Sequence, residues 1–436
     1  MRSKSHFLIA AASSGSGKTT LSLGLLRALR NRNLKVQPFK CGPDYIDIKF
    51  HELASSLPAY NLDTFMASES HVQQLYARKS RDCDVCLTEG VMGMFDGYDR
   101  MQGSSAQIAG LLGIPVVLVI NAKSMAYSAA AMIYGFKNFD KRVNVVGVVF
   151  NFVASDSHYQ FLKEACCDVG VEALGYLPKN ADIAIPSRHL GLNIDKEFVF
   201  DEFADKAALL CEEHIDIDRL LEITKRNIVD TDSISDAPTD NGRLKIAVAK
   251  DEAFNFVYHE NIDVLQTMGE VSFFSPIHDA ALPDADFVYL PGGYPELYLE
   301  PLSNNKAMRE SIKSYVENGG RLLAECGGMM YLSAAIADAE GKEYPMVGVF
   351  DQQASMQHMK LKLGYRTFAY NGLDVRGHEF HYSTLDSCLP SVAQLCNAKG
   401  AQVDTKLLRY KNAIAGYTHI YWGDGMNILD LFFTEK

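Results

Sequence analysis

The sequence predicts an α/β protein made of two doubly wound domains, and three observations support this fold class. Short apolar runs alternate with amphipathic stretches from the N-terminus onward, which is typical of a mostly parallel sheet with helices on both faces. A polar stretch rich in Asp, Ser and Thr interrupts this pattern, and a second alternating series follows it. The 436 residues are too many for one ordinary core. We therefore expect domains at 1–226 and 243–436 with a linker at 227–242.

In the first domain, apolar runs of strand length alternate with stretches that have helical periodicity. The strands are expected at 7–12, 35–40, 84–90, 115–122, 144–152 and 173–178, and the helices at 19–32, 70–80 and 104–113. Such a series predicts a mostly parallel sheet, because parallel neighbours need a crossover helix between them.

The second domain repeats the pattern after the linker. Its strands are expected at 244–249, 271–274, 286–293 and 320–326. An amphipathic stretch at 302–320 ends in two glycines, which commonly terminate helices, so one helix is expected there.

Composition excludes several classes of protein. Hydrophobic residues make up 47% and charged residues 22% of the chain, as in a globular protein. The net charge of -12 argues against a general nucleic-acid surface. No apolar run reaches the roughly 18 residues that span a bilayer, so no membrane partner is expected. The nine cysteines are scattered and no secretory leader is apparent, which predicts reduced thiols and a cytoplasmic protein.

The first expected strand runs directly into ASSGSGKTT and then into a helix. This is a Walker A phosphate-binding loop in the strand-loop-helix setting that the motif requires. Its glycines let backbone N–H groups approach phosphate oxygens, Lys18 can reach the β and γ phosphates, and the Thr19 hydroxyl can bind Mg²⁺. The residues expected to bind ATP are Gly15, Ser16, Gly17, Lys18, Thr19 and Thr20.

Phosphoryl transfer also needs carboxylates for a metal, and two groups of acids follow expected strands. Asp44 and Asp47 follow the second strand together with Lys40, whereas Glu89 ends another strand and Asp96 lies beyond it. The carboxyl ends of parallel strands meet at one edge of the sheet, which is where open α/β sheets bind ligands. For any single acid, helix capping or turn formation remains an equal alternative.

A phosphate-binding loop alone covers switches, motors, partitioning ATPases, kinases and ligases. Partitioning ATPases carry an additional lysine early in the loop, where this chain has Ser13. The base-reading NKxD motif of GTPases is also missing, since residues 121–124 read NAKS. These two observations weigh against the partitioning and GTPase classes.

Cys326 is expected on a sharp turn between an apolar strand and an apolar helix, in AECGGMMYL. Backbone N–H groups and a helix start at such a turn favour a thiolate and an oxyanion, and Gly292 and Gly293 could add further donors. The thiol also needs a base. His419, on an apolar strand-like run, is preferred over His378 and His381, which lie in the polar stretch RGHEFHYS.

Together these motifs resemble the cobyrinic acid a,c-diamide synthase family along nearly the whole chain. The resemblance rests on AASSGSGKTT, FKCGPDYID, NLDTF, TEGVMGMFDG, RHLGL, LPGGYPEL, AECGGMMYL, RGHEFHYS and GYTHIYW. It implies a P-loop amidoligase domain of the dethiobiotin-synthetase type, followed by a class I glutamine amidotransferase domain with a flavodoxin-like fold.

The resemblance also implies roles for particular residues. Cys326 would be the glutaminase nucleophile and His419 its base, while Asn151 would contact the adenine of ATP. The residues expected to serve Mg²⁺ are Thr19, Asp44, Asp47 and Glu89, and those expected to contact the substrate or activate its carboxylate are Lys40, Asp96, Arg188 and His189.

The chain departs from the family pattern at two places. Relatives usually have Asn-Arg where this chain has Asn151-Phe152. The glutaminase motif ends in HIYW, with Tyr421 where ordinary class I enzymes have Glu. No third member of the Cys326–His419 pair can therefore be named, and Glu325 beside the nucleophile has no assigned role.

The implied reaction uses ATP, Mg²⁺ and glutamine to convert the a and c carboxylates of cobyrinate into amides, and a homodimer is possible. Three alternatives stay open: the same chemistry on nickel-sirohydrochlorin or hydrogenobyrinate, amidation at more positions as in cobyric acid synthase, and a P-loop switch or scaffold whose amidotransferase-like domain is not catalytic.

Overall fold

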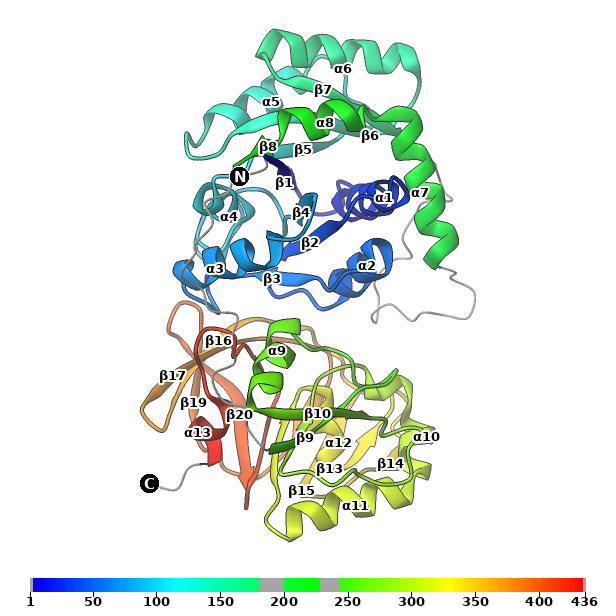
Figure 1. Ribbon diagram of the computed structural model, residues 1–436. Helices are drawn as coiled ribbons and strands as arrows, with labels where there is room; N and C mark the ends of the chain where they lie inside the picture. The colour runs from blue at the N-terminus through cyan, green and yellow to red at the C-terminus, as the bar shows by residue number, and fades with distance from the viewer. Residues whose placement is uncertain (1–2, 181–199, 228–243, 434–436) are drawn as a thin grey trace. The chain divides into compact units, whose positions relative to one another are not determined.

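The computed structural model describes residues 3–180, 200–227 and 244–433, which form two compact units on either side of residues 228–243 (Figure 1). Each unit has its own sheet and its own buried core. The predicted linker, 227–242, lies almost wholly outside the described residues, so its limits and those of the two domains stay predictions.

The first unit is built on an eight-stranded sheet in the order β3-β2-β4-β1-β5-β6-β7, with β8 beside β1. Along this path every pairing of the described strands is parallel, and β8 alone pairs antiparallel. The strands are β1 Lys4–Ala11, β2 Val36–Cys41, β3 Tyr60–Leu62, β4 Val85–Glu89, β5 Val116–Asn121, β6 Val145–Val153, β7 Glu172–Pro178 and β8 Lys225–Arg226.

Helices cover both faces of this sheet, as the sequence predicts. They are α1 Lys18–Asn31, α2 Ile46–Ser55, α3 Glu69–Ser80, α4 Ser105–Leu112, α5 Ala129–Asn138, α6 Asp156–Val169, α7 Phe200–His214 and α8 Ile217–Ile223. Alternate β1 residues share one buried cluster with α1, α2, α7 and α8, because side chains along a strand point to opposite faces. Figure 1 shows α3 and α4 on the other side of the sheet.

The second unit contains a ten-stranded sheet in the order β10-β9-β11-β12-β21-β20-β19-β16-β17-β22. The first five strands are parallel in flavodoxin-like order, and the last five pair antiparallel. The bounds are β9 Leu244–Ala249, β10 Gly269–Phe274, β11 Phe287–Leu290, β12 Arg321–Glu325, β16 Lys362–Tyr370, β17 Leu373–His381, β19 Gln394–Asn397, β20 Gln402–Tyr410, β21 Ala413–Gly416 and β22 His419–Ile420.

Smaller elements complete the second unit. They are the helices α9 His259–Met268, α10 Leu299–Asn304, α11 Lys306–Glu317, α12 Gly327–Leu332 and α13 Ile428–Phe433, the 3-10 turn η2 Pro295–Leu297, and a separate sheet in the order β14-β13-β15-β18, formed by β13 Ser333–Ala337, β14 Glu343–Pro345, β15 Phe350–Ser355 and β18 Thr384–Asp386.

The predicted fold class is confirmed, with two differences in the second unit. The single helix predicted at 302–320 is wrong: Asn305 separates α10 from α11, because its side chain accepts a hydrogen bond from the Met308 N–H at 3.3 Å and caps α11. The antiparallel strands between 362 and 410 were not predicted. They alternate buried and exposed residues and lack the continuous apolar runs of the parallel strands.

Candidate active sites

The phosphate-binding loop lies between β1 and α1, and Asn151 braces it. Gly17 has a φ of 99°, in the left-handed region, and a Cβ at this position would lie 1.9 Å from Asn151 Nδ2. The same Nδ2 donates a hydrogen bond to the Ser16 carbonyl at 3.0 Å. Asn151, predicted to contact adenine, therefore reaches the loop from β6 and holds its backbone.

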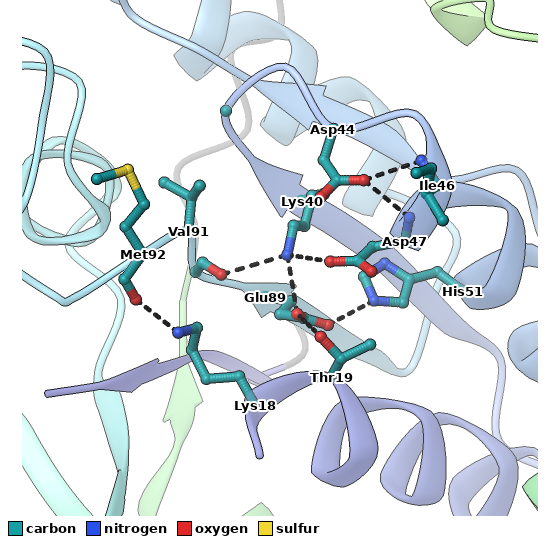
Figure 2. A network of polar contacts seen from close by, with 12 residues as sticks. Lys18, Thr19, Lys40, Asp44, Ile46, Asp47, His51, Glu89, Val91 and Met92 are labelled. Atoms are coloured by element: carbon teal, nitrogen blue, oxygen red, sulfur yellow. Dashed lines mark hydrogen bonds and ion pairs between the residues drawn. The ribbon is translucent and has the colours of Figure 1, made fainter. Parts of the chain in front are cut away.

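Lys18 begins α1 and contacts two backbone segments. Its Nζ donates to the Met92 carbonyl at 2.5 Å (Figure 2). It also donates to the Ser13 carbonyl at 3.4 Å. Burial, together with the charge of Lys40, lowers the pKa of Lys18 to about 8. An anionic phosphate beside this ammonium would restore the pKa, so the charged form of Lys18 is suited to bind a polyanion.

A network of buried charges lies at the carboxyl ends of β2 and β4 (Figure 2). Lys40 and Glu89 lie opposite each other on these neighbouring strands. The Lys40 ammonium contacts Glu89 Oε1 at 2.8 Å and Asp47 Oδ2 at 2.7 Å, and all three side chains are buried. Thr19 Oγ1 donates to Glu89 Oε1 at 2.7 Å, and His51 Nε2 lies 2.7 Å from Glu89 Oε2.

The pKa shifts follow from these pairings. Burial alone would raise the pKa of Glu89, but Lys40 and His51 hold it well below its usual value. Burial would likewise lower the pKa of Lys40, but Asp47 and Glu89 raise it. Both groups are therefore charged in the folded protein. His51 was missed in the sequence, although it lies four residues after Asp47 and thus on the same face of α2.

The remaining predicted residues of the first unit have more local contacts. Asp44 Oδ1 accepts hydrogen bonds from the Ile46 and Asp47 N–H groups at 2.9 and 2.8 Å, which is the capping alternative for this acid. Asp96 Oδ2 accepts one from the Gly93 N–H at 3.2 Å. Arg188 and His189 lie outside the described residues.

The ligand atoms near Lys40 suit Mg²⁺ in kind, since two carboxylates contact its ammonium and the Thr19 hydroxyl donates to one of them, that of Glu89. The carboxylates of Asp47 and Glu89 hold the Lys40 ammonium between them. Across the part of the chain that the structure describes, no group of three or more His, Cys, Asp or Glu side chains is already arranged around a metal position.

In the second unit, Cys326 lies on the predicted sharp turn between β12 and α12. Its φ of 47° and ψ of −107° are strained for a residue with a side chain. Its N–H donates to the Gly416 carbonyl at 2.7 Å. Burial is the largest of the effects that raise the pKa of its thiol, so the sulfur rests as a thiol and needs a base.

The Gly292–Gly293 pair approaches both the histidine and the nucleophile turn. A Cβ on Gly292 would lie 2.2 Å from His419 Cε1. A Cβ on Gly327, next to Cys326, would lie 3.1 Å from the Gly293 backbone N. These close approaches bring the segments of Gly292–Gly293, Cys326 and His419 together, as the glutaminase prediction requires.

The three histidines differ in their surroundings. His378 lies opposite His419 in the pairing of β17 with β22, and His381 stacks on Tyr417 with ring centroids 3.6 Å apart. His381 Nδ1 is also 3.0 Å from the Ser383 carbonyl, which fixes the ring. Burial first, and then the charges of His378 and His381, lower the pKa of His419 to about 3. His419 is therefore uncharged at neutral pH and able to accept a proton.

Two buried glutamates, Glu325 and Glu260, contact the segment that contains His419. Glu325, which had no role in the sequence, lies with Oε2 4.0 Å from His419 Nδ1. Tyr421, found where related enzymes have Glu, donates its hydroxyl to Glu260 Oε2 at 2.7 Å. Glu325 comes near His419 because β12 pairs with β21 and the chain then turns into β22, whose Ile420 N–H donates to Glu325, and sequence spacing does not reveal this pairing.

No helix in the described ranges is both long and apolar enough to cross a membrane.

Two family models match the chain: a CobQ/CobB/MinD/ParA nucleotide binding domain at residues 7–192 and a CobB/CobQ-like glutamine amidotransferase domain at residues 245–426. The first unit thus belongs to a nucleotide-binding family and the second to an amidotransferase family.

Curated relatives match almost the whole length. A cobyrinate a,c-diamide synthase of Listeria monocytogenes serotype 4b is 39% identical and covers 98% of both chains. Enzymes of the same name from Salmonella typhimurium and Streptococcus sanguinis are 38% and 40% identical, with 98% and 96% of both chains covered. Because this similarity includes both units and both sites, the chain belongs to the cobyrinate a,c-diamide synthase family.

Proposed function

We propose that this protein uses ATP and glutamine to convert the a and c carboxylates of cobyrinate into amides. The observation that carries the proposal is the near full-length similarity to enzymes named for this product, at 38–40% identity. The geometry supports it, because one chain holds a phosphate-binding loop with buried charges and a cysteine turn beside a histidine.

The second unit releases ammonia from glutamine. Cys326 Sγ attacks the side-chain amide carbon while His419 accepts the thiol proton, and backbone N–H groups near Gly292 and Gly293 stabilise the oxyanion. His419 then donates the proton to the departing nitrogen, which leaves as ammonia. Water hydrolyses the thioester to glutamate and restores the thiol. A weakly acidic thiol and a neutral imidazole are the starting states that this sequence needs.

The first unit activates the carboxylate. A substrate carboxylate oxygen attacks the γ-phosphorus of ATP, which gives an acyl phosphate and ADP, and ammonia then displaces phosphate to leave the amide. Lys18 compensates the phosphate charge, and Asn151 supports the loop around the phosphates. Thr19, Asp47 and Glu89 would hold Mg²⁺, which supplies further compensation of phosphate charge when bound.

Lys40 and Asp96 are proposed to contact the carboxylate that is activated, and both influence the Lys18 ammonium electrostatically. The contacts predicted for Arg188 and His189 stay predictions, as do a metal role for Asp44, the possible homodimer and the cytoplasmic location. Sedimentation velocity of the purified protein tests the dimer directly.

The test is mass spectrometry of the products formed from ATP and glutamine with cobyrinate, hydrogenobyrinate or nickel-sirohydrochlorin in parallel reactions. Two successive conversions of carboxylate to amide on cobyrinate are expected. Amidation of hydrogenobyrinate or nickel-sirohydrochlorin alone would identify that compound as the substrate in place of cobyrinate. No product in any reaction would refute the proposed amide synthesis.

Cys326→Ala provides the matched control. It should form no amide with glutamine but retain the activity with ammonium chloride, because its phosphate-binding unit is unchanged. If the wild type and Cys326→Ala both formed no amide with either glutamine or ammonium chloride, a P-loop switch or scaffold would be favoured instead.

A further inference from the structure

Glu325 is a buried acid at the end of β12, directly before the nucleophile. It is 2% exposed. Its Oε1 accepts a hydrogen bond from the Ile420 N–H at 3.0 Å, and its Oε2 accepts one from the Tyr289 hydroxyl at 2.6 Å. The same Oε2 is 4.0 Å from His419 Nδ1. One carboxyl group therefore contacts the strand of His419 through the backbone and faces its ring as well.

A carboxylate is an unfavourable choice if this position serves packing alone. Burial raises the pKa of Glu325 to about 8, and the hydrogen bonds from Tyr289 and Ile420 offset only part of that effect. Because few groups stabilise the ionised form of this buried acid, a cation that forms beside it stabilises the carboxylate strongly. The cation available here is the imidazolium of His419, which forms when the ring accepts the thiol proton.

The other groups around His419 are less suited to stabilise its imidazolium. Burial first, and then His378 and His381 on β17, lower the pKa of His419, so neither of these histidines supports an imidazolium. The hydroxyl of Tyr421 is engaged with Glu260. Glu296, Glu379 and Glu325 all act electrostatically on Cys326, and their charges raise the pKa of its thiol, so this effect does not distinguish the three acids. The carboxylate of Glu325, with Oε2 4.0 Å from His419 Nδ1, is placed to pair with an imidazolium.

We propose that Glu325 is the positioning residue that directs Nδ1 of His419 toward β12 and stabilises the imidazolium paired with the Cys326 thiolate. The inference rests on the proposed glutaminase function of this pair. The proton moves from Sγ to Nε2, the Nδ1–H then faces Glu325 Oε2, and no other bond changes. Catalytic hydrogen bonds are often long before substrate binds, so the distance of 4.0 Å shortens as the charge develops.

The test compares Glu325→Gln with Tyr289→Phe. Glutamine keeps the size of the side chain and removes its charge, whereas Tyr289→Phe removes one hydrogen bond to Oε2 and leaves the carboxyl group in place. We expect Glu325→Gln to lower the glutaminase kcat about 100-fold with KM for glutamine unchanged, since general acid–base catalysis contributes on that order. Tyr289→Phe should lower kcat less than about tenfold, and both variants should retain amidation with ammonium chloride.

A second readout needs no glutamine turnover. Alkylation of Cys326 by iodoacetamide, followed on its own peptide by mass spectrometry, reports how readily the thiolate–imidazolium pair forms. Loss of the Glu325 charge should slow alkylation at neutral pH about tenfold, because the thiolate–imidazolium pair forms less readily. An effect of that charge on the thiol alone has the opposite sign, since Glu325 also raises the pKa of Cys326. Tyr289→Phe should leave the alkylation rate close to that of the wild type.

The outcomes separate this inference from the proposed function. A Glu325→Gln alkylation rate equal to or above that of the wild type would overturn the role of Glu325, whatever the activity. A fall in kcat that Tyr289→Phe matches would do the same, because it would show a packing effect. A wild type that hydrolyses no glutamine, together with the expected slowing of alkylation in the variant, would refute the glutaminase and leave the positioning of His419 intact.

Discussion

At Gly17 the phosphate-binding loop has neither the backbone conformation nor the space that a side chain needs. Both its positive φ and the 1.9 Å between an added Cβ and Asn151 Nδ2 exclude a side chain. We expect Gly17→Ala to displace Asn151 from the Ser16 carbonyl and to weaken ATP binding at least about tenfold, the equivalent of one lost hydrogen bond. Isothermal titration with ATP measures this, and the glutaminase activity should not change.

Gly113→Ala is the matched control. Gly113 also has a positive φ, of 63°, but no atom lies within 4 Å of an added Cβ. Its substitution should cost about 1–2 kcal/mol in unfolding free energy and leave ATP affinity at the wild-type value. If both variants bound ATP equally well, the proposed bracing by Asn151 would be wrong.

His381 illustrates how a buried side chain couples stability to pH. Burial lowers its pKa from 6.5 to about 4. In the unfolded chain the same group is protonated below 6.5, so its contribution to stability is complete above pH 6.5 and is lost as the pH falls toward 4. His381→Phe keeps a ring against Tyr417 and removes the titration.

Urea denaturation at a series of pH values checks this expectation. Between pH 6.5 and 4 the wild type should lose up to about 3 kcal/mol more unfolding free energy than His381→Phe. The glutaminase activity of the variant should stay within a few-fold, because His419 is the proposed base. Parallel stability curves would show that His381 does not titrate in this way, and loss of activity would reopen its alternative role as base.

The loop that follows β11 lies close to β22 at Gly292. A Cβ at Gly292 would lie 2.2 Å from the His419 ring, so Gly292→Ala must move the loop or the histidine. We expect glutamine hydrolysis to fall at least about 100-fold, because misplacement of a catalytic group by about 1 Å has an effect of this order. Amidation with ammonium chloride should persist.

Gly319→Ala controls for the general effect of an added methyl group in this unit. Gly319 follows α11, and no atom lies within 4 Å of its Cβ position. This variant should hydrolyse glutamine at the wild-type rate even if its positive φ costs stability. Full glutaminase activity in Gly292→Ala would contradict the close approach of the two elements.

Across the whole chain, features carried by local patterns could be predicted, whereas features that depend on distant pairing could not. Apolar runs alternating with helices predict the parallel sheet of the first unit and the parallel half of the sheet in the second unit. The glycine-rich turns predict Lys18 and Cys326. The contact between Glu325 and His419 depends on β21 lying beside β12 and on the turn into β22, which no short motif encodes. His51 could have been found from its spacing to Asp47, but its contact with Glu89 depends on how α2 packs.

The presence of a separate sheet and core in each unit predicts that the two half-reactions can be lost independently. Lys18→Ala removes the phosphate-binding ammonium and should abolish amide formation with either nitrogen source, while glutamine hydrolysis continues. Cys326→Ala should show the converse, with amide formed from ammonium chloride and none from glutamine. Product mass spectrometry and glutamate release measure the two activities on the same samples. Loss of glutamine hydrolysis in a folded Lys18→Ala protein would show instead that the nucleotide site controls the glutaminase, because no change in the second core accounts for such a loss.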